Sequence, residues 1–143
     1  MSIHSEWINS LKTFNPSLKL PPPSLEELSI EYLEIKPNDL MIGKLPFQRK
    51  FTNPTGHFQG GFLSAAMDEV FGPLAYISTK KPCHSLSLNL TFIRPFKESD
   101  EFCLIEAKIL SITQSFIFMK GEIKTQEGKL IACAETHMKK AEQ

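Results

Sequence analysis

Apolar residues recur at helical spacing near the start of the chain and again in its middle. The first repeat spans residues 2–14 and predicts a short amphipathic helix that ends at Asn15-Pro16. The second begins after Gly60-Gly61 and predicts a long, largely buried helix, whose inner stripe is Leu63, Met67, Val70, Leu74 and Ile77. Because Pro73 lies inside this pattern, we expect the helix to kink or end near Gly72.

Apolar and polar residues alternate along several other segments, most strictly from Ser85 to Phe92. This period of two predicts a strand there. Turn-forming residues separate the other strand-like runs, so the six expected strands span about residues 32–35, 40–45, 85–92, 101–112, 115–125 and 129–138. One long helix placed after two strands and before four more predicts an α+β fold, in which a single antiparallel sheet wraps around the helix.

The length of 143 residues suits one hydrophobic core, so we expect a single domain over 1–143. Residues 1–27 would contain the N-terminal helix and a connector that Pro21-Pro22-Pro23 keeps extended. Ser24 and Glu27 have the spacing of a capping box, which predicts a further helical turn from that point.

Sixteen basic residues balance sixteen acidic ones, so no global charge favours nucleic acid or an anionic membrane. The three cysteines are widely spaced and form no CxxC pair, which indicates reduced thiols and no metal site. The first residues resemble no signal peptide, and no apolar run has membrane length. We therefore expect a cytoplasmic protein without nucleic-acid or membrane partners.

Residues 53–68, NPTGHFQGGFLSAAMD, hold groups suited to thioester hydrolysis. Gly60 and Gly61 lie where loop becomes helix, and the first N–H groups of a helix are unpaired and can stabilise an oxyanion. Asp68 offers a carboxylate, but it lies roughly 12 Å further along the same helix. Two antiparallel subunits would bring the two groups together, so we expect an obligate dimer.

The run N-x-x-G-x-x-Q-G-G, followed by Asp68, resembles the phenylacetate-pathway (PaaI-like) branch of the hotdog-fold acyl-CoA thioesterases. That family usually has histidine where this chain has Gln59. The likeness is densest from Thr52 to Asp68 and extends to the alternating strand SLSLNLTFIRP. It implies a hotdog fold and hydrolysis of an acyl-CoA or aryl-CoA thioester.

The resemblance also assigns catalytic roles. Gly60 would donate its N–H to the thioester carbonyl, and Asp68 of the partner subunit would act as nucleophile or general base. Asn53 would orient the carbonyl or the water. Ser85 matches a position whose hydroxyl helps the carboxylate to hold water, and Ser87 is expected beside it on the same face.

Gln59 completes the expected catalytic set, whereas Gly61, His57, Ser87, Phe92 and Arg94 are expected to bind substrate. Gln59 cannot titrate, but its amide can donate a hydrogen bond and fix the loop. His57 would share a face with Gln59 and can contribute an imidazole, while Gly61 supplies a neighbouring N–H. Phe92 would line an acyl or aryl pocket, and Arg94, with nearby Lys97, would meet the phosphates of coenzyme A.

The sequence thus predicts a homo-oligomeric thioesterase, at least a homodimer and, by expectation, a homotetramer of two dimers. No cofactor or metal is expected, since coenzyme A is part of the substrate. The alternative is a non-catalytic acyl-CoA binding or regulatory protein on the same fold, which the replacement of histidine by Gln59 makes credible. Asn53, Gly60 and Asp68 together favour the enzyme, because a binder needs no carboxylate beside a thioester.

Overall fold

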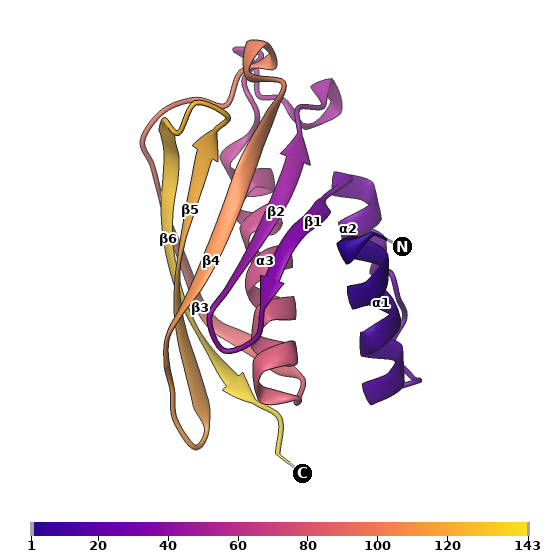
Figure 1. Ribbon diagram of the computed structural model, residues 1–143. Coiled ribbons are helices and arrows are strands. Elements are labelled where there is room, and N and C mark those ends of the chain that lie inside the picture. Colours follow the sequence, from indigo (N-terminus) through magenta and orange to yellow (C-terminus); the bar gives the residue numbers. More distant parts are fainter. Residues whose placement is uncertain (1, 143) are drawn as a thin grey trace.

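An antiparallel sheet curls around one long helix in the computed structural model, which describes residues 2–142 (Figure 1). The helices are α1 (Ile3–Phe14), α2 (Pro23–Leu28) and α3 (Gly60–Thr79). The strands are β1 (Glu31–Lys36), β2 (Leu40–Pro46), β3 (Cys83–Phe92), β4 (Phe102–Ile112), β5 (Phe116–Thr125) and β6 (Leu130–Lys140). Their order in the sheet is β1-β2-β4-β5-β6-β3, with every neighbouring pair antiparallel. The predicted α+β class, the strand number and the hotdog architecture are confirmed.

Helix α3 packs its predicted stripe against the concave face of the sheet. Leu63, Met67, Val70 and Leu74 are buried, whereas Ile77 is only partly covered. The sheet comes closest at Gly121 of β5, where an added Cβ would lie 2.5 Å from Met67 Cε. Glycine at this position therefore lets the middle of α3 sit tightly against the sheet.

Pro73 does not end α3, which continues to Thr79. The helix therefore does not end near Gly72, while the kink expected there stays a prediction. Proline removes one N–H donor from the backbone hydrogen bonds of α3. However, buried residues on both sides of Pro73, such as Val70 and Leu74, keep the helix packed against the sheet. Tertiary packing outweighs the local cost here.

The N-terminal segment covers the β1 edge of the fold (Figure 1). Helix α1 buries one face, formed by Trp7, Ile8 and Leu11. The indole of Trp7 packs edge-on against Tyr32 of β1, with 4.9 Å between the ring centroids. Helix α2 begins at Pro23 behind Pro22, without a side-chain cap. The capping box expected at Ser24 is therefore wrong, because Pro23 takes the first helical position and Ser24 lies inside the helix rather than before it.

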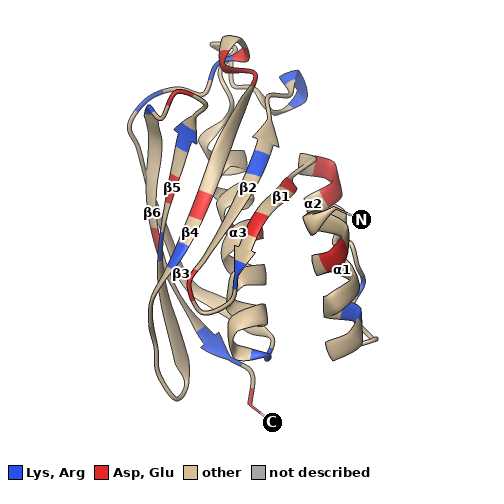
Figure 2. Ribbon diagram, in the orientation of Figure 1, with Lys and Arg blue, Asp and Glu red and all other residues tan. Residues whose placement is uncertain are grey.

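Basic and acidic residues are interspersed along the strands and at both ends of the molecule (Figure 2). Several form neighbouring ion pairs on the surface, such as Glu34 with Lys36 and Glu122 with Lys124. Between residues 2 and 142, no helix is both long and apolar enough to cross a membrane.

Candidate active site

The loop that precedes α3 is held together by the side chain of Asn53. Its Oδ1 accepts hydrogen bonds from Thr55 N–H (3.0 Å), Thr55 Oγ1 (2.7 Å) and His57 N–H (3.1 Å). The backbone closes the same turn, since Asn53 N–H donates to His57 O at 2.7 Å. With Oδ1 occupied, the Nδ2 group of Asn53 is the part of this side chain that remains available to a ligand.

Helix α3 starts with two unpaired donors. Gln59 is its N-cap, and the Gln59 carbonyl accepts from Phe62 N–H (3.1 Å) and Leu63 N–H (3.2 Å). Within residues 2–142, the N–H groups of Gly60 and Gly61 have no acceptor. Both lie at the positive end of a long helix dipole, which is the environment that a developing oxyanion requires.

Gln59 fixes the loop through its backbone rather than its side chain. Its N–H donates to Phe51 O at 2.8 Å, and its side chain is exposed and makes no hydrogen bond to any described residue. The amide is therefore free to reach a substrate. The loop itself is ordered by Asn53 and by the bridge between Thr52 and Phe58, so this part of the structure does not require histidine at position 59.

A cavity of about 350 Å³ opens at this helix end. Its wall includes four residues expected from the sequence besides Gly60, namely Asn53, His57, Phe92 and Arg94. The remainder is mainly apolar and comes from Phe58, Leu63, Ile93, Pro95 and Phe96. Phe58 and Leu63 belong to the motif segment itself, whereas Ile93, Pro95 and Phe96 could not be assigned from it, because the segment after β3 reaches the loop only through the fold.

Phe92 lies directly over Gly60. A Cβ added at Gly60 would lie 3.0 to 3.3 Å from the Phe92 ring, whereas one added at Gly61 would meet nothing within 4 Å. The ring is half exposed, so it can move. Glycine at position 60 therefore allows an aromatic side chain to sit beside the free N–H group.

The carboxylate of Asp68 lies elsewhere, on the side of α3 that faces β3. Ser85 Oγ donates to Asp68 Oδ1 at 3.0 Å, which confirms that these two residues meet. Asp68 does not line the cavity at Gly60, as expected for groups two helical turns apart in one chain. Within a single subunit, the N–H donor of Gly60 and the carboxylate of Asp68 therefore lie at separate places.

Glu69, the neighbouring carboxylate, points away from Asp68 toward α2. Its Oε1 accepts a hydrogen bond from Ser24 Oγ, and the Glu69 carbonyl accepts one from Tyr32 Oη at 2.8 Å. Burial raises the pKa of Glu69 and the nearby charge of Asp68 adds to this, although the Ser24 hydroxyl opposes it. Glu69 thus connects the N-terminal segment to α3.

Glu69→Gln is expected to raise the melting temperature near neutral pH. A carboxyl with a raised pKa in the folded state contributes stability below its unfolded pKa of about 4.3 and loses it as pH rises through the folded value. Glutamine stays neutral and still accepts from Ser24, so its advantage should shrink as pH falls toward 4. Thermal unfolding followed by circular dichroism between pH 4 and 8 measures this, and a pH-independent difference would contradict it.

Ser87 does not lie beside Ser85, which corrects the expectation that both share a face. The pairing of β3 with β6 contains a bulge, so that Ser85 pairs with Met138 but Ser87 pairs with His137. The extra residue reverses the alternation, and Ser87 Oγ instead lies 2.7 Å from His137 Nδ1 on the outer face of the sheet. His137 lies outside the segments that carry the family resemblance.

Comparisons with known proteins agree with this architecture. A family model described as "Thioesterase superfamily" matches residues 55–132 of this chain, which include Gly60, Asp68 and Ser85. Escherichia coli PaaI, from the phenylacetic acid degradation operon, superposes with a TM-score of 0.81 at 12% identity, covering 95% of this chain and 96% of PaaI.

Two further solved structures share the fold. AziG from S. sahachiroi has a TM-score of 0.81 at 17% identity, with 85% of this chain and 98% of AziG covered. A thioesterase from Haemophilus influenzae has a TM-score of 0.75 at 17% identity, with 83% and 82% covered. A search of curated protein sequences found no match. The match over more than half of the chain shows that this protein belongs to the thioesterase superfamily.

Proposed function

We propose that the protein hydrolyses an acyl-CoA or aryl-CoA thioester to the free carboxylic acid and coenzyme A, in sites shared between two subunits. The observation that carries this proposal is the pair of unpaired N–H groups at the start of α3, of which Gly60 lines an apolar cavity. Such donors stabilise the oxyanion that forms when a thioester carbonyl is attacked. The chemistry uses protein groups and water alone.

A homodimer would supply the missing carboxylate. Strand β3 pairs only with β6 among the described strands, so its other edge is open, and Asp68 lies next to it through Ser85. A second copy paired antiparallel along β3 would bring the two α3 helices side by side, with Gly60 of one subunit near Asp68 of the partner subunit. Leu86 on this strand is 48% exposed and would become covered.

The outer face of the sheet offers a surface through which two such dimers would form a tetramer. Two large apolar side chains, Leu110 and Phe118, are exposed there and line one shallow cavity. Isolated exposed apolar residues are ordinary, but a group of them on one sheet face is typical of protein interfaces. We propose this face for the second contact.

In the proposed reaction, Gly60 N–H holds the carbonyl oxygen while Asp68 of the partner subunit acts on the carbonyl carbon. The Ser85 hydroxyl occupies Oδ1, so Oδ2 is free either to take a proton from water or to attack directly. Attack by water gives a tetrahedral oxyanion that collapses and expels the coenzyme A thiolate, whereas attack by the carboxylate expels the thiolate as an anhydride forms, which water then opens. Label in Asp68 after a single turnover in H₂¹⁸O would show the anhydride route with water opening the anhydride at Asp68, because direct attack by water on the thioester places ¹⁸O only in the product.

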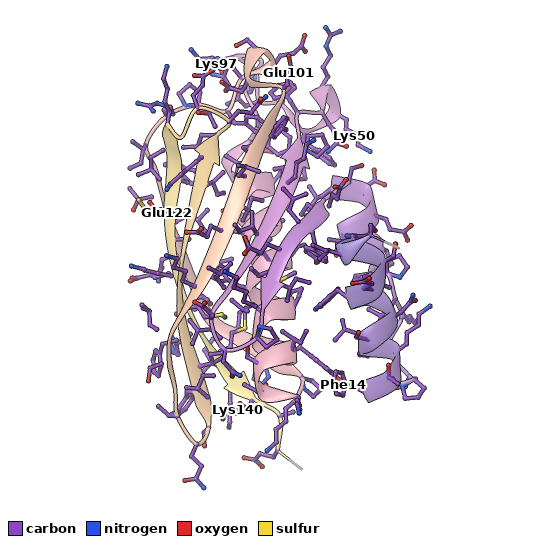
Figure 3. All side chains as sticks on the ribbon, in the orientation of Figure 1. Phe14, Lys50, Lys97, Glu101, Glu122 and Lys140 are labelled. Carbon is purple, nitrogen blue, oxygen red and sulfur yellow. The ribbon has the colours of Figure 1, made fainter. Side chains whose placement is uncertain are left out.

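The nucleotide part of coenzyme A has a candidate position next to the acyl cavity. A second cavity of about 440 Å³ shares Arg94 and Pro95 with the first and also contains Lys97 and Lys129. Lys97 lies at the end of the molecule where the β3–β4 connection turns (Figure 3). The Arg94 side chain makes no ion pair with any residue in 2–142, so its charge is available to a phosphate.

Arg94→Ala is expected to raise KM for acyl-CoA about five- to tenfold and to leave kcat nearly unchanged, because it removes a phosphate contact that is the same in ground and transition states. The effect should weaken in high salt. The same acyl group on N-acetylcysteamine lacks the nucleotide and should show no change. Lys12→Ala is the control. It removes a different exposed cation, which lies on α1, and should behave as wild type.

Release of free coenzyme A tests the proposed function directly. The protein is incubated with acyl-CoA and aryl-CoA thioesters of increasing size, and thiol release is followed with a chromogenic thiol reagent. Saturable turnover of at least one thioester is expected. Saturable binding without turnover across the panel would instead support the acyl-CoA binding protein.

A further inference from the structure

The ring of Phe92 is the part of the cavity wall that crowds Gly60. The three atoms nearest to a Cβ added at Gly60 are Cζ, Cε2 and Cε1 of this ring, at 3.0, 3.2 and 3.3 Å. Both residues line the same cavity at the start of α3. One edge of the Phe92 ring therefore borders the residue whose N–H is the proposed oxyanion donor.

The inner wall of this cavity belongs to the core. Phe58, Leu63 and Phe96 are at most 3% exposed, and the rings of Phe58 and Phe96 pack 5.2 Å apart. Phe92 differs, because it is 49% exposed and its ring contacts no other aromatic ring within residues 2–142. Its backbone is nevertheless fixed, since Phe92 pairs with Ala132 of β6. The Phe92 side chain can therefore be replaced without disturbing the core.

The proposed reaction decides which part of a substrate meets this ring. A carbonyl oxygen that accepts from Gly60 N–H lies about 2.9 Å from the nitrogen, so the carbonyl carbon is about 4 Å from it. The ring edge borders Gly60 and thus faces the atoms bonded to this carbon rather than the far end of the acyl group. The sulfur leads to coenzyme A, whose proposed nucleotide position includes Arg94 and Pro95. The carbon next to the carbonyl is left to face Phe92.

From this geometry we infer that Phe92 restricts the substrates to thioesters whose carbon next to the carbonyl is an unbranched CH₂ group, as in straight-chain acyl-CoA. This inference rests on the proposed function and narrows its substrate class. A CH₂ group passes the ring edge, whereas a methyl branch on that carbon needs space beside Gly60 that the ring already fills. In a close-packed contact an added methyl group has to displace its neighbour, and this lowers kcat/KM.

Two isomeric thioesters test this inference, hexanoyl-CoA and 2-methylpentanoyl-CoA. They contain the same atoms and differ in a branch at the carbon next to the carbonyl. Release of free coenzyme A gives kcat/KM for each, and the ratio of the two values is the preference for the unbranched isomer. Branching also slows the uncatalysed reaction, so the decisive quantity is the change in this preference on substitution. Phe92→Ala should lower the preference about tenfold or more. An unchanged preference would overturn the inference.

Two further variants assign the effect to the ring. Phe92→Leu removes less of the side chain than alanine does and should give an intermediate preference. Ile93→Ala removes the next side chain of the same cavity, which is not among the three atoms nearest to Gly60. It should change kcat/KM of both isomers by the same factor and keep the wild-type preference. An equal loss of preference in the Ile93→Ala protein would refute the role of Phe92.

The failure of this inference differs from the failure of the proposed function. If the wild-type protein hydrolyses none of the thioesters in the panel, the proposed function is refuted, and the inference falls with it. If it hydrolyses both isomers with a preference that does not depend on Phe92, only the inference is refuted. Thermal unfolding of each variant checks that a change in preference is measured on folded protein.

Discussion

Asp68→Asn is expected to lower kcat for thioester hydrolysis by about two orders of magnitude or more, the usual cost of removing a catalytic base or nucleophile. Asparagine has the same shape, and its Oδ1 can still accept the hydrogen bond from Ser85. The half-exposed position should also tolerate the change without loss of folding. Initial rates of coenzyme A release, measured together with thermal unfolding, separate catalysis from stability.

The adjacent carboxylate provides the matched control. Glu69→Gln removes one charge from the same turn of α3, but Glu69 faces Ser24 rather than the β3 edge. It should therefore retain most of the activity. Ser85→Ala should fall between the two with a loss of about tenfold, because it leaves Asp68 without its donor but does not remove the carboxylate. Near-normal turnover by Asp68→Asn would rule out Asp68 as the reacting group.

The elements of the fold were predictable because burial on one side imposes a period on the sequence. The stripe from Leu63 to Leu74 follows from packing against the core, and the strand predicted at β3 is confirmed, with Leu88 and Leu90 packed against the same core. The predicted meeting of Asp68 and Ser85 is also confirmed. It was given by family resemblance, since nothing local to either residue implies the other.

Two of the errors have a common physical cause. The bulge after Ser85 adds a residue to β3 that the polar–apolar alternation does not reveal, and it moves Ser87 to the outer face. The packing of Val70 and Leu74 against the sheet carries α3 past Pro73, which a local helix-breaking rule does not include. Local rules thus fail where the geometry depends on a contact with a distant segment.

Gly60→Pro is expected to reduce kcat about a hundredfold or more, because it deletes the proposed oxyanion donor. The structure should tolerate proline here: position 60 is the first residue of α3, and Gln59 already has the extended conformation that precedes proline (φ −70°, ψ 138°). Gly60→Ala is the matched control. It crowds Phe92 in a similar way but keeps the N–H, so its activity should stay within about tenfold of wild type.

Mixing the two inactive proteins tests whether the site is shared between subunits. If Gly60 of one subunit acts with Asp68 of the partner subunit, a heterodimer of Gly60→Pro and Asp68→Asn contains one intact site and one doubly altered site. After free exchange, half of the dimers are mixed, so about a quarter of the wild-type activity should return. If both groups acted within one chain, every site would lack one of them and no activity would appear. Recovery on mixing, measured against each variant alone, therefore distinguishes a composite site from a single-chain site.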